Sequence, residues 1–147
     1  MNKATFVLFG IFTVVTLATS NCYAEYNSPE QLIEAGVNMY KKEGAKGAIL
    51  GWLKGSALEG SKEALSQANV LRQIEDFYGN FLDYDIIKTN NLSKKSKIYC
   101  VAFNFNEGIL YGKFQIYKNH NNKLVSTEFK FHTESTMIFP PWIVFGK

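Results

Sequence analysis

Residues 61–79, with the sequence SKEALSQANVLRQIEDFYG, carry the clearest secondary-structure signal of the chain. Their apolar side chains recur every three or four positions, at Ala64, Leu65, Ala68, Leu71, Ile74, Phe77 and Tyr78. This spacing predicts a helix with one buried face, which begins after Ser61 and ends at Gly79. Beyond Gly79 the apolar period shortens from about 3.6 residues to about 2, the period of a β-strand.

Another helix is predicted upstream, over residues 29–42. Ser28 can cap it, Pro29 suits its first position, and Gln31 completes a capping box with Ser28. The helix has an apolar face formed by Leu32, Ile33, Gly36, Val37 and Tyr40. This spacing again indicates that one side of the helix is buried.

A short helix is predicted between these two, in the glycine-rich segment GAKGAILGWLKG, residues 44–55. Its apolar side chains are those of Ala48, Ile49, Trp52 and Leu53. Gly47, Gly51 and Gly55 repeat every four residues along one side. Glycines weaken a helix, so we expect a neighbouring element of the same domain to pack closely on them. The alternative is a face that associates with another helix.

Four strands are predicted after Gly79, at residues 82–89, 97–105, 109–118 and 124–133. Short turns join them, so consecutive strands are expected to be antiparallel neighbours in a meander. The predicted fold is therefore α+β, with three N-terminal helices packed on one face of a four-stranded antiparallel meander sheet.

Alternation along the predicted strands separates two faces of the sheet. The inner face, expected beneath the helices, comprises Val101, Phe103, Phe105, Leu110, Phe114, Ile116, Val125, Phe129 and Phe131. The outer face comprises Ile98, Cys100, Ala102, Asn104, Ile109, Tyr111, Lys113, Gln115, Tyr117, Ser126, Glu128, Lys130 and His132. Its apolar centre and charged surroundings are typical of an interface, so we expect a partner or the chain's own tail to cover it. The candidate interface residues are Ile98, Tyr111, Tyr117 and His132.

The C-terminal tail, about residues 135–147, is apolar but contains Pro140 and Pro141, which argue against a regular strand or helix at that point. We predict that the tail wraps over a sheet edge or over the mouth of a pocket. Trp142 and Phe145 are its candidates for covering the outer face of the sheet. The alternative is an exposed anchor for a protein partner, because Trp and Phe are frequent at interfaces.

The N-terminal segment, residues 1–24, has the features of a signal peptide. Lys3 supplies the positive charge, an apolar run follows, and Cys22-Tyr23-Ala24 offers small residues at the cleavage positions. The apolar run is too short to cross a bilayer comfortably, which favours cleavage over a retained anchor. We therefore expect a periplasmic or secreted protein of one domain, residues 25–147, with no membrane segment after cleavage.

Cleavage after Ala24 makes Glu25 the expected first residue of the exported protein. The measurement is intact-mass spectrometry of the protein recovered from the cell envelope and from the culture fluid. A full-length species that persists in the membrane would contradict this prediction and favour an anchored component.

The sequence predicts no catalytic residue, no metal-ligand set and no cofactor. His120 is expected in a turn and His132 on the outer face, without the closely spaced ligands that a metal needs. Cys100 is the cysteine that remains after cleavage, and we expect it to be buried and inert. A net charge of +3 and the lack of a long basic stripe argue against nucleic acid as a partner. The one basic cluster, Lys94-Lys95-Ser96-Lys97, is interpreted as a solvated turn.

The order of the predicted elements resembles that of the nuclear-transport-factor-like and cystatin-like superfamily, in particular its small exported bacterial members of unknown function. The junction Gln73-Ile74-Glu75-Asp76-Phe77-Tyr78-Gly79 contributes to this resemblance, which covers residues 28–139. It implies a conical pocket between helices and sheet, and a homodimer formed through the outer face. The candidate pocket-lining residues are Tyr40, Trp52, Phe77, Phe103, Phe114 and Phe129.

Enzymes of this superfamily, such as ketosteroid isomerase and the dehydratases, place Asp, Tyr or His in that pocket. The inner face of the second to fourth predicted strands offers no such carboxylate or imidazole, which argues against this chemistry. We therefore expect a non-enzymatic domain that binds a small apolar ligand or a protein partner. Two alternatives stay open: an isomerase- or dehydratase-like enzyme, and a structural component of an envelope assembly such as a type IV secretion system.

Overall fold

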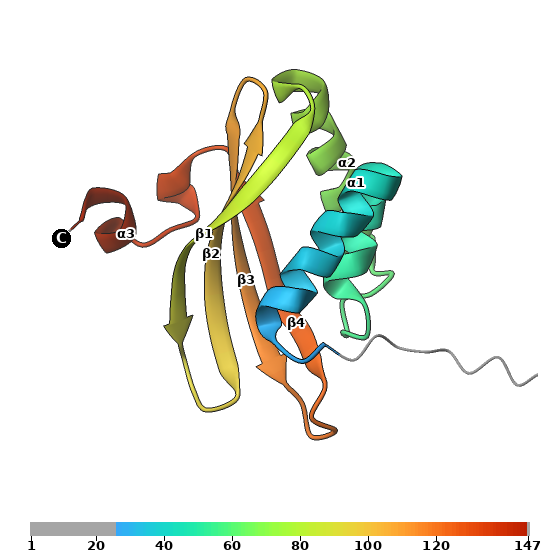
Figure 1. Cartoon of the computed structure of the whole chain (residues 1–147), viewed down its shortest axis with the longest axis vertical. Coiled ribbons are helices and arrows are strands. Elements are labelled where there is room, and N and C mark those ends of the chain that lie inside the picture. The colour runs from blue at the N-terminus through green and yellow to red at the C-terminus, as the bar shows by residue number, and fades with distance from the viewer. Residues whose placement is uncertain (1–25, 147) are drawn as a thin grey trace, which may run out of the picture.

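The computed structural model describes residues 26–146, so the predicted signal peptide lies outside the described residues. Its elements are α1 (Pro29–Leu53), α2 (Lys62–Tyr78), β1 (Phe81–Asn91), β2 (Ser96–Phe105), β3 (Ile109–Lys118), β4 (Leu124–His132), the 3-10 turn η1 (Ser135–Met137) and α3 (Pro141–Phe145). The four strands form one antiparallel sheet in the order β1-β2-β3-β4. Helices α1 and α2 lie on one side of the sheet and α3 lies on the other (Figure 1). The predicted α+β meander is confirmed.

The helices differ from the prediction in one respect. Two long helices precede the sheet where three were predicted, because the first two are joined in α1 and change direction at Gly44. Gly44 has φ 69° and ψ −161°, a conformation that glycine tolerates and that other residues rarely adopt. The chain therefore turns within one residue and continues as a helix.

The two halves of α1 pack closely on each other through glycines, as predicted for the glycine-rich segment. A Cβ atom added to Gly51 would lie 2.7 Å from the Cα of Gly36. A Cβ atom added to Gly36 would overlap the indole ring of Trp52. Gly55 does not belong to this contact, because it follows α1 and has no atom within 4 Å of its Cβ position.

Trp52 lies at the centre of the core and is 2% exposed. Its ring lies 5.2 Å from Phe103, 5.4 Å from Phe114 and 5.1 Å from Phe129, measured between ring centres. The indole Nε1–H donates a hydrogen bond of 2.9 Å to the carbonyl of Ile33 in the first half of α1. One side chain therefore connects both halves of α1 to the inner face of the sheet.

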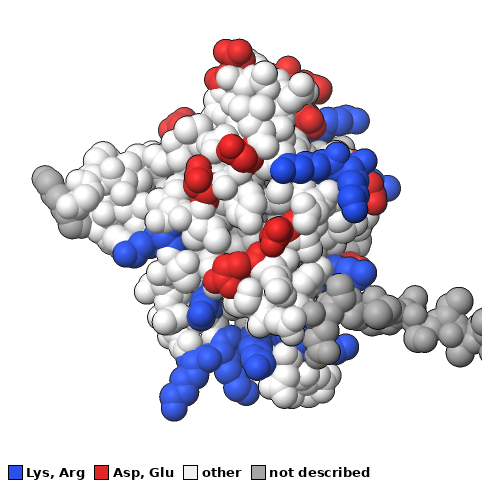
Figure 2. Space-filling view, viewed as in Figure 1, with Lys and Arg blue, Asp and Glu red and all other residues white. Residues whose placement is uncertain are grey.

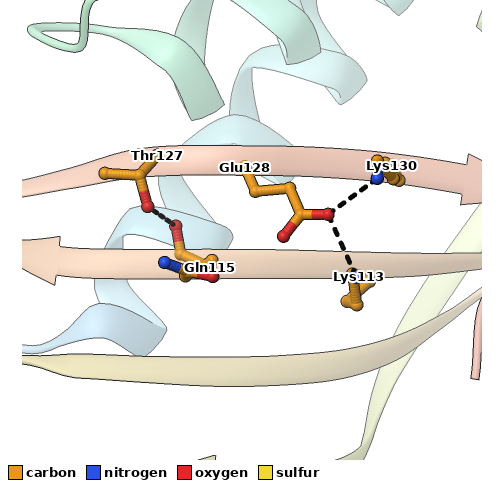
Figure 3. A network of polar contacts seen from close by, with 5 residues as sticks. All are labelled: Lys113, Gln115, Thr127, Glu128 and Lys130. Atoms are coloured by element: carbon orange, nitrogen blue, oxygen red, sulfur yellow. Dashed lines mark hydrogen bonds and ion pairs between the residues drawn. The ribbon is translucent and has the colours of Figure 1, made fainter. Parts of the chain in front are cut away.

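A β-bulge in β4 changes which face two residues occupy. Ile116 pairs with Ser126 and Gln115 pairs with Glu128, so Thr127 is an extra residue in β4. Its hydroxyl donates to the carbonyl of Gln115 at 3.3 Å (Figure 3). The predictions for Ser126 and Val125 were wrong because the extra residue reverses the alternation before it: Ser126 lies on the inner face and is 1% exposed, whereas Val125 pairs with Tyr117 on the outer face.

Candidate functional site

The predicted pocket between helices and sheet is filled by side chains. Tyr40, Trp52, Phe103 and Phe114 are all buried there, and Phe129 stacks on Phe114 with ring centres 4.7 Å apart. The cavity that remains has a volume of about 10 Å³ and is lined by Val37, Tyr40, Trp52, Leu71, Phe81, Phe103 and Phe105. That volume is about the minimum for one water molecule. Among the described residues, this cavity between helices and sheet is therefore too small for a small apolar ligand.

Phe77 is not part of this interior, although it was a candidate pocket-lining residue. Its side chain is 78% exposed, and its ring lies 5.1 Å from that of Tyr78 on the surface. Helix α2 packs mainly against α1, and its buried residues are Ala64, Ala68 and Leu71. The buried face of α2 therefore contains fewer residues than the apolar spacing predicted, and Phe77 is not one of them.

The tail covers part of the outer face of the sheet. Phe139 is 4% exposed, and its ring lies 5.5 Å from that of Tyr111, edge to face. Trp142 and Phe145, the residues expected to make this contact, are 44% and 64% exposed. The tail, which was the alternative to a homodimer at this face, therefore contacts Tyr111, but through a different aromatic residue.

The other candidate interface residues have different surroundings. Ile98 and Tyr117 are half-buried, and Ile98 faces the tail across a cavity. His132 uses its Nδ1 atom to accept the backbone N–H of Glu134 at 2.9 Å. Lys113 and Lys130 both bind the Glu128 carboxylate at 3.0 Å (Figure 3). Burial disfavours the charged carboxylate, but these two ammonium groups outweigh burial and lower the pKa of Glu128.

A cleft of about 390 Å³ lies at the end of the sheet where α1 begins. Its lining comes from the start of α1, from the β1–β2 turn, and from both strands of the β3–β4 hairpin, and consists of Tyr26, Asn27, Pro29, Lys94, Lys95, Lys97, Ile116, Lys118, Asn122 and Leu124. We call this the basic cleft. In Figure 1 both turns and the start of α1 lie at the lower end of the molecule, and Figure 2 shows lysine side chains gathered there.

The four lysines of the basic cleft converge because of strand pairing. Lys97 pairs with Ile116, which places Lys118 two residues further along the same face of β3. The backbone N–H of Lys118 donates to the carbonyl of Lys95 at 2.8 Å, which brings the β1–β2 turn against the end of β3. Lys94 precedes Lys95 in that turn.

The charge of the cleft is only slightly compensated. None of the four lysines has an ion pair within 4 Å to another residue in the range 26–146. Glu30, in the first turn of α1, accepts a 2.6 Å hydrogen bond from the hydroxyl of Tyr99. Burial acts to raise the pKa of Glu30, but the Tyr99 hydrogen bond and, more weakly, Lys97 lower it. The start of α1 adds the positive end of a helix dipole.

The lysines of the cleft were not among the candidate site residues predicted from the sequence. Lys94–Lys97 was interpreted as a solvated turn, and Lys118 was not considered with it. The signal lies in the strand register: once the two hairpins are aligned, Lys97 and Lys118 fall on one face at one end of the sheet. An electropositive cleft of this size can bind an anion.

The remaining acidic and thiol groups lie outside the two sites described so far. Asp83 and Asp85 are exposed and both accept from the side-chain amide of Asn104, at 2.6 and 3.0 Å. The part of the chain from residue 26 to 146 contains no group of three or more His, Cys, Asp or Glu side chains able to hold a metal ion. Cys100 is buried, and burial raises the pKa of its thiol, against a weaker opposite effect of Lys113.

Comparisons with known proteins do not assign this chain to a family. No protein-family model, curated protein or solved structure matches this chain significantly. Of the helices between residues 26 and 146, none is long and apolar enough to cross a membrane.

Proposed function

We propose that this chain is an exported, non-enzymatic binding domain whose ligand is a small anion with two or more negative charges, held in the basic cleft. The convergence of Lys94, Lys95, Lys97 and Lys118 on one cleft, without ion-pair partners among the described residues, is the observation that carries the proposal. Gathering like charges costs free energy, and a bound anion would offset that cost.

The size and composition of the cleft favour a small ligand. About 390 Å³ falls within the usual range of small-molecule pockets. Lysine ammonium groups bind phosphate and carboxylate groups as point charges, without the planar geometry that arginine requires. Ile116 and Leu124 provide an apolar part of the lining, against which the body of an organic anion can pack.

A binding role agrees with the residue types in the cleft better than catalysis does. The lining described above consists of lysines, asparagines, one tyrosine, one proline and two aliphatic side chains. Such a set can hold and orient an anion, but it lacks the paired acid and base that proton transfer to a substrate needs. Because side chains fill the space between helices and sheet, we do not propose an apolar ligand there.

The test uses pyrophosphate as the probe, with titration calorimetry at low and at physiological ionic strength. We expect Lys97→Gln/Lys118→Gln to bind pyrophosphate about tenfold more weakly than the unmodified protein, since two partly screened charges are lost. Lys42→Gln/Lys46→Gln is the matched control, because these two exposed lysines lie on α1 outside the cleft and carry the same charge.

The outcomes separate a local site from a general charge effect. Binding should weaken with salt, because the cleft is open to solvent. Equal losses in the two double variants would mean that only the net charge matters. No binding of pyrophosphate at low ionic strength would reject the proposal.

A further inference from the structure

The C-terminal tail and the outer face of the sheet enclose a second cavity, of about 240 Å³. The sheet contributes Lys88, Asn90, Ile98, Cys100 and Lys113, and the tail contributes Ile138, Pro140, Trp142 and Ile143. We call it the tail cavity. The tail lies on the opposite side of the sheet from α1 and α2 (Figure 1), and no residue lines both the tail cavity and the cavity between helices and sheet.

The floor of the tail cavity is a row of three side chains in register. Lys88 of β1 pairs with Cys100 of β2, which pairs with Lys113 of β3. Cys100 is 3% exposed, and burial keeps its thiol neutral, so the middle of the floor is apolar. The two ends of the row carry ammonium groups.

The two ammonium groups are not equivalent. Lys113 lies 3.0 Å from Glu128, which it shares with Lys130, so its charge is partly compensated. Lys88 makes no ion pair with a residue in the described part of the chain, and its Nζ lies 6.0 Å from the centre of the Trp142 ring. Lys88 is therefore the lysine of the lining whose charge no carboxylate among the described residues offsets, and it lies beside an aromatic ring, with no acidic residue in the lining.

The roof of the tail cavity has one buried side chain among residues 135–146, that of Phe139. Phe139 is buried against Tyr111, but α3, which follows it, contains no buried residue. Ile138, Pro140 and Ile143 close the cavity with apolar surface, while Trp142 remains 44% exposed. Segments with so little burial open at low cost in free energy, which gives a ligand a way in.

We propose that the tail cavity binds a small amphipathic anion, a single carboxylate on a medium-length apolar chain. The carboxylate would lie at the Lys88 ammonium, and the apolar chain would lie between Ile98 and Cys100 on the sheet and Ile138 and Ile143 on the tail. A cavity of this volume suits one such chain and excludes a two-chain lipid. This site is independent of the basic cleft, because no residue lines both.

The experiment follows alkylation of Cys100 by iodoacetamide, with mass spectrometry of the peptide that contains it. Decanoate, below its micellar concentration, is the probe, and decanol is the uncharged control of equal length. We expect decanoate at ten times its dissociation constant to slow the alkylation about tenfold, because a filled cavity covers the thiol. Calorimetry with decanoate should give the same dissociation constant.

Three variants test whether the carboxylate of decanoate binds at the Lys88 ammonium group. Lys88→Gln should weaken decanoate binding about fivefold, whereas Lys88→Arg should retain it. Lys130→Gln is the matched control: Lys130 pairs with Lys113 in the same row and binds the same Glu128, yet lies outside the cavity. It should leave binding unchanged.

Any of three results would overturn the proposal. Protection by decanol equal to that by decanoate would show that the charge at Lys88 is not used. If calorimetry detects no binding of decanoate, the tail cavity is not a site for it. If Lys88→Gln and Lys130→Gln weaken the binding equally, decanoate does not bind through Lys88 in the tail cavity. Failure of the pyrophosphate test leaves this outcome unaffected, because the two sites share no residue.

Discussion

Replacing Trp52 with alanine should lower the free energy of unfolding by about 3–5 kcal/mol, as large-to-small changes in well-packed cores do. The indole is 2% exposed, contacts three phenylalanine rings and donates a hydrogen bond to Ile33. Alanine would leave a cavity between α1 and the sheet that the surrounding rings can fill only in part. The measurement is urea unfolding followed by circular dichroism.

Trp142→Ala is the control for this prediction. Trp142 is 44% exposed on the short helix α3, where no residue is buried. Its removal should change the free energy of unfolding by no more than about 0.5 kcal/mol, as is usual at surface positions. Equal effects of the two substitutions would contradict the central position of Trp52 in the core.

Gly36→Ala should destabilise the protein by about 1–3 kcal/mol, the range of overpacked cores, although alanine favours helices by about 1 kcal/mol over glycine. The added Cβ would overlap the Trp52 ring, and this ring is held on its other side by the aromatic side chains of the sheet. The overlap is therefore expected to exceed the gain in helix propensity. Urea unfolding measures whether the substitution lowers or raises the free energy of unfolding.

A double-mutant cycle identifies the cause of that destabilisation. In a Trp52→Ala background the methyl group added by Gly36→Ala meets empty space, so this substitution should become neutral or stabilising. Additive losses in the double variant would mean that the glycine is needed for another reason, such as its contact with Gly51.

The sequence predicted most of the fold because its periodic patterns are strong and local. The apolar spacing before Gly79 and the alternation after it identified both long helical regions and all four strands. The three predicted helices are confirmed only in part, because the first two follow each other within α1, where a single non-helical residue, Gly44, marks the change of direction. Phe77 was misplaced because spacing shows which side of α2 is apolar, but not how far its neighbours extend along it.

The candidate sites depend on register, which periodicity does not contain. Thr127 is an ordinary residue in the sequence, yet as a bulge it moves Ser126 into the core and Val125 to the outer face. Likewise, pairing of β2 with β3 brings Lys97 and Lys118 to one face, and the row across three strands places Lys88 and Lys113 on either side of Cys100. These positions are set by hydrogen bonds between segments far apart in the chain.

Local chemistry along the chain therefore accounts for the two helical regions, the meander and the central role expected of Trp52. Tertiary contacts account for the packed interior, the coverage of Tyr111 by Phe139, and the two cavities at which lysines from separate strands meet. The physical reason is the range of the interactions involved. Apolar periodicity and capping act within a few residues, whereas a cleft or a cavity exists only after distant segments have excluded water from one another.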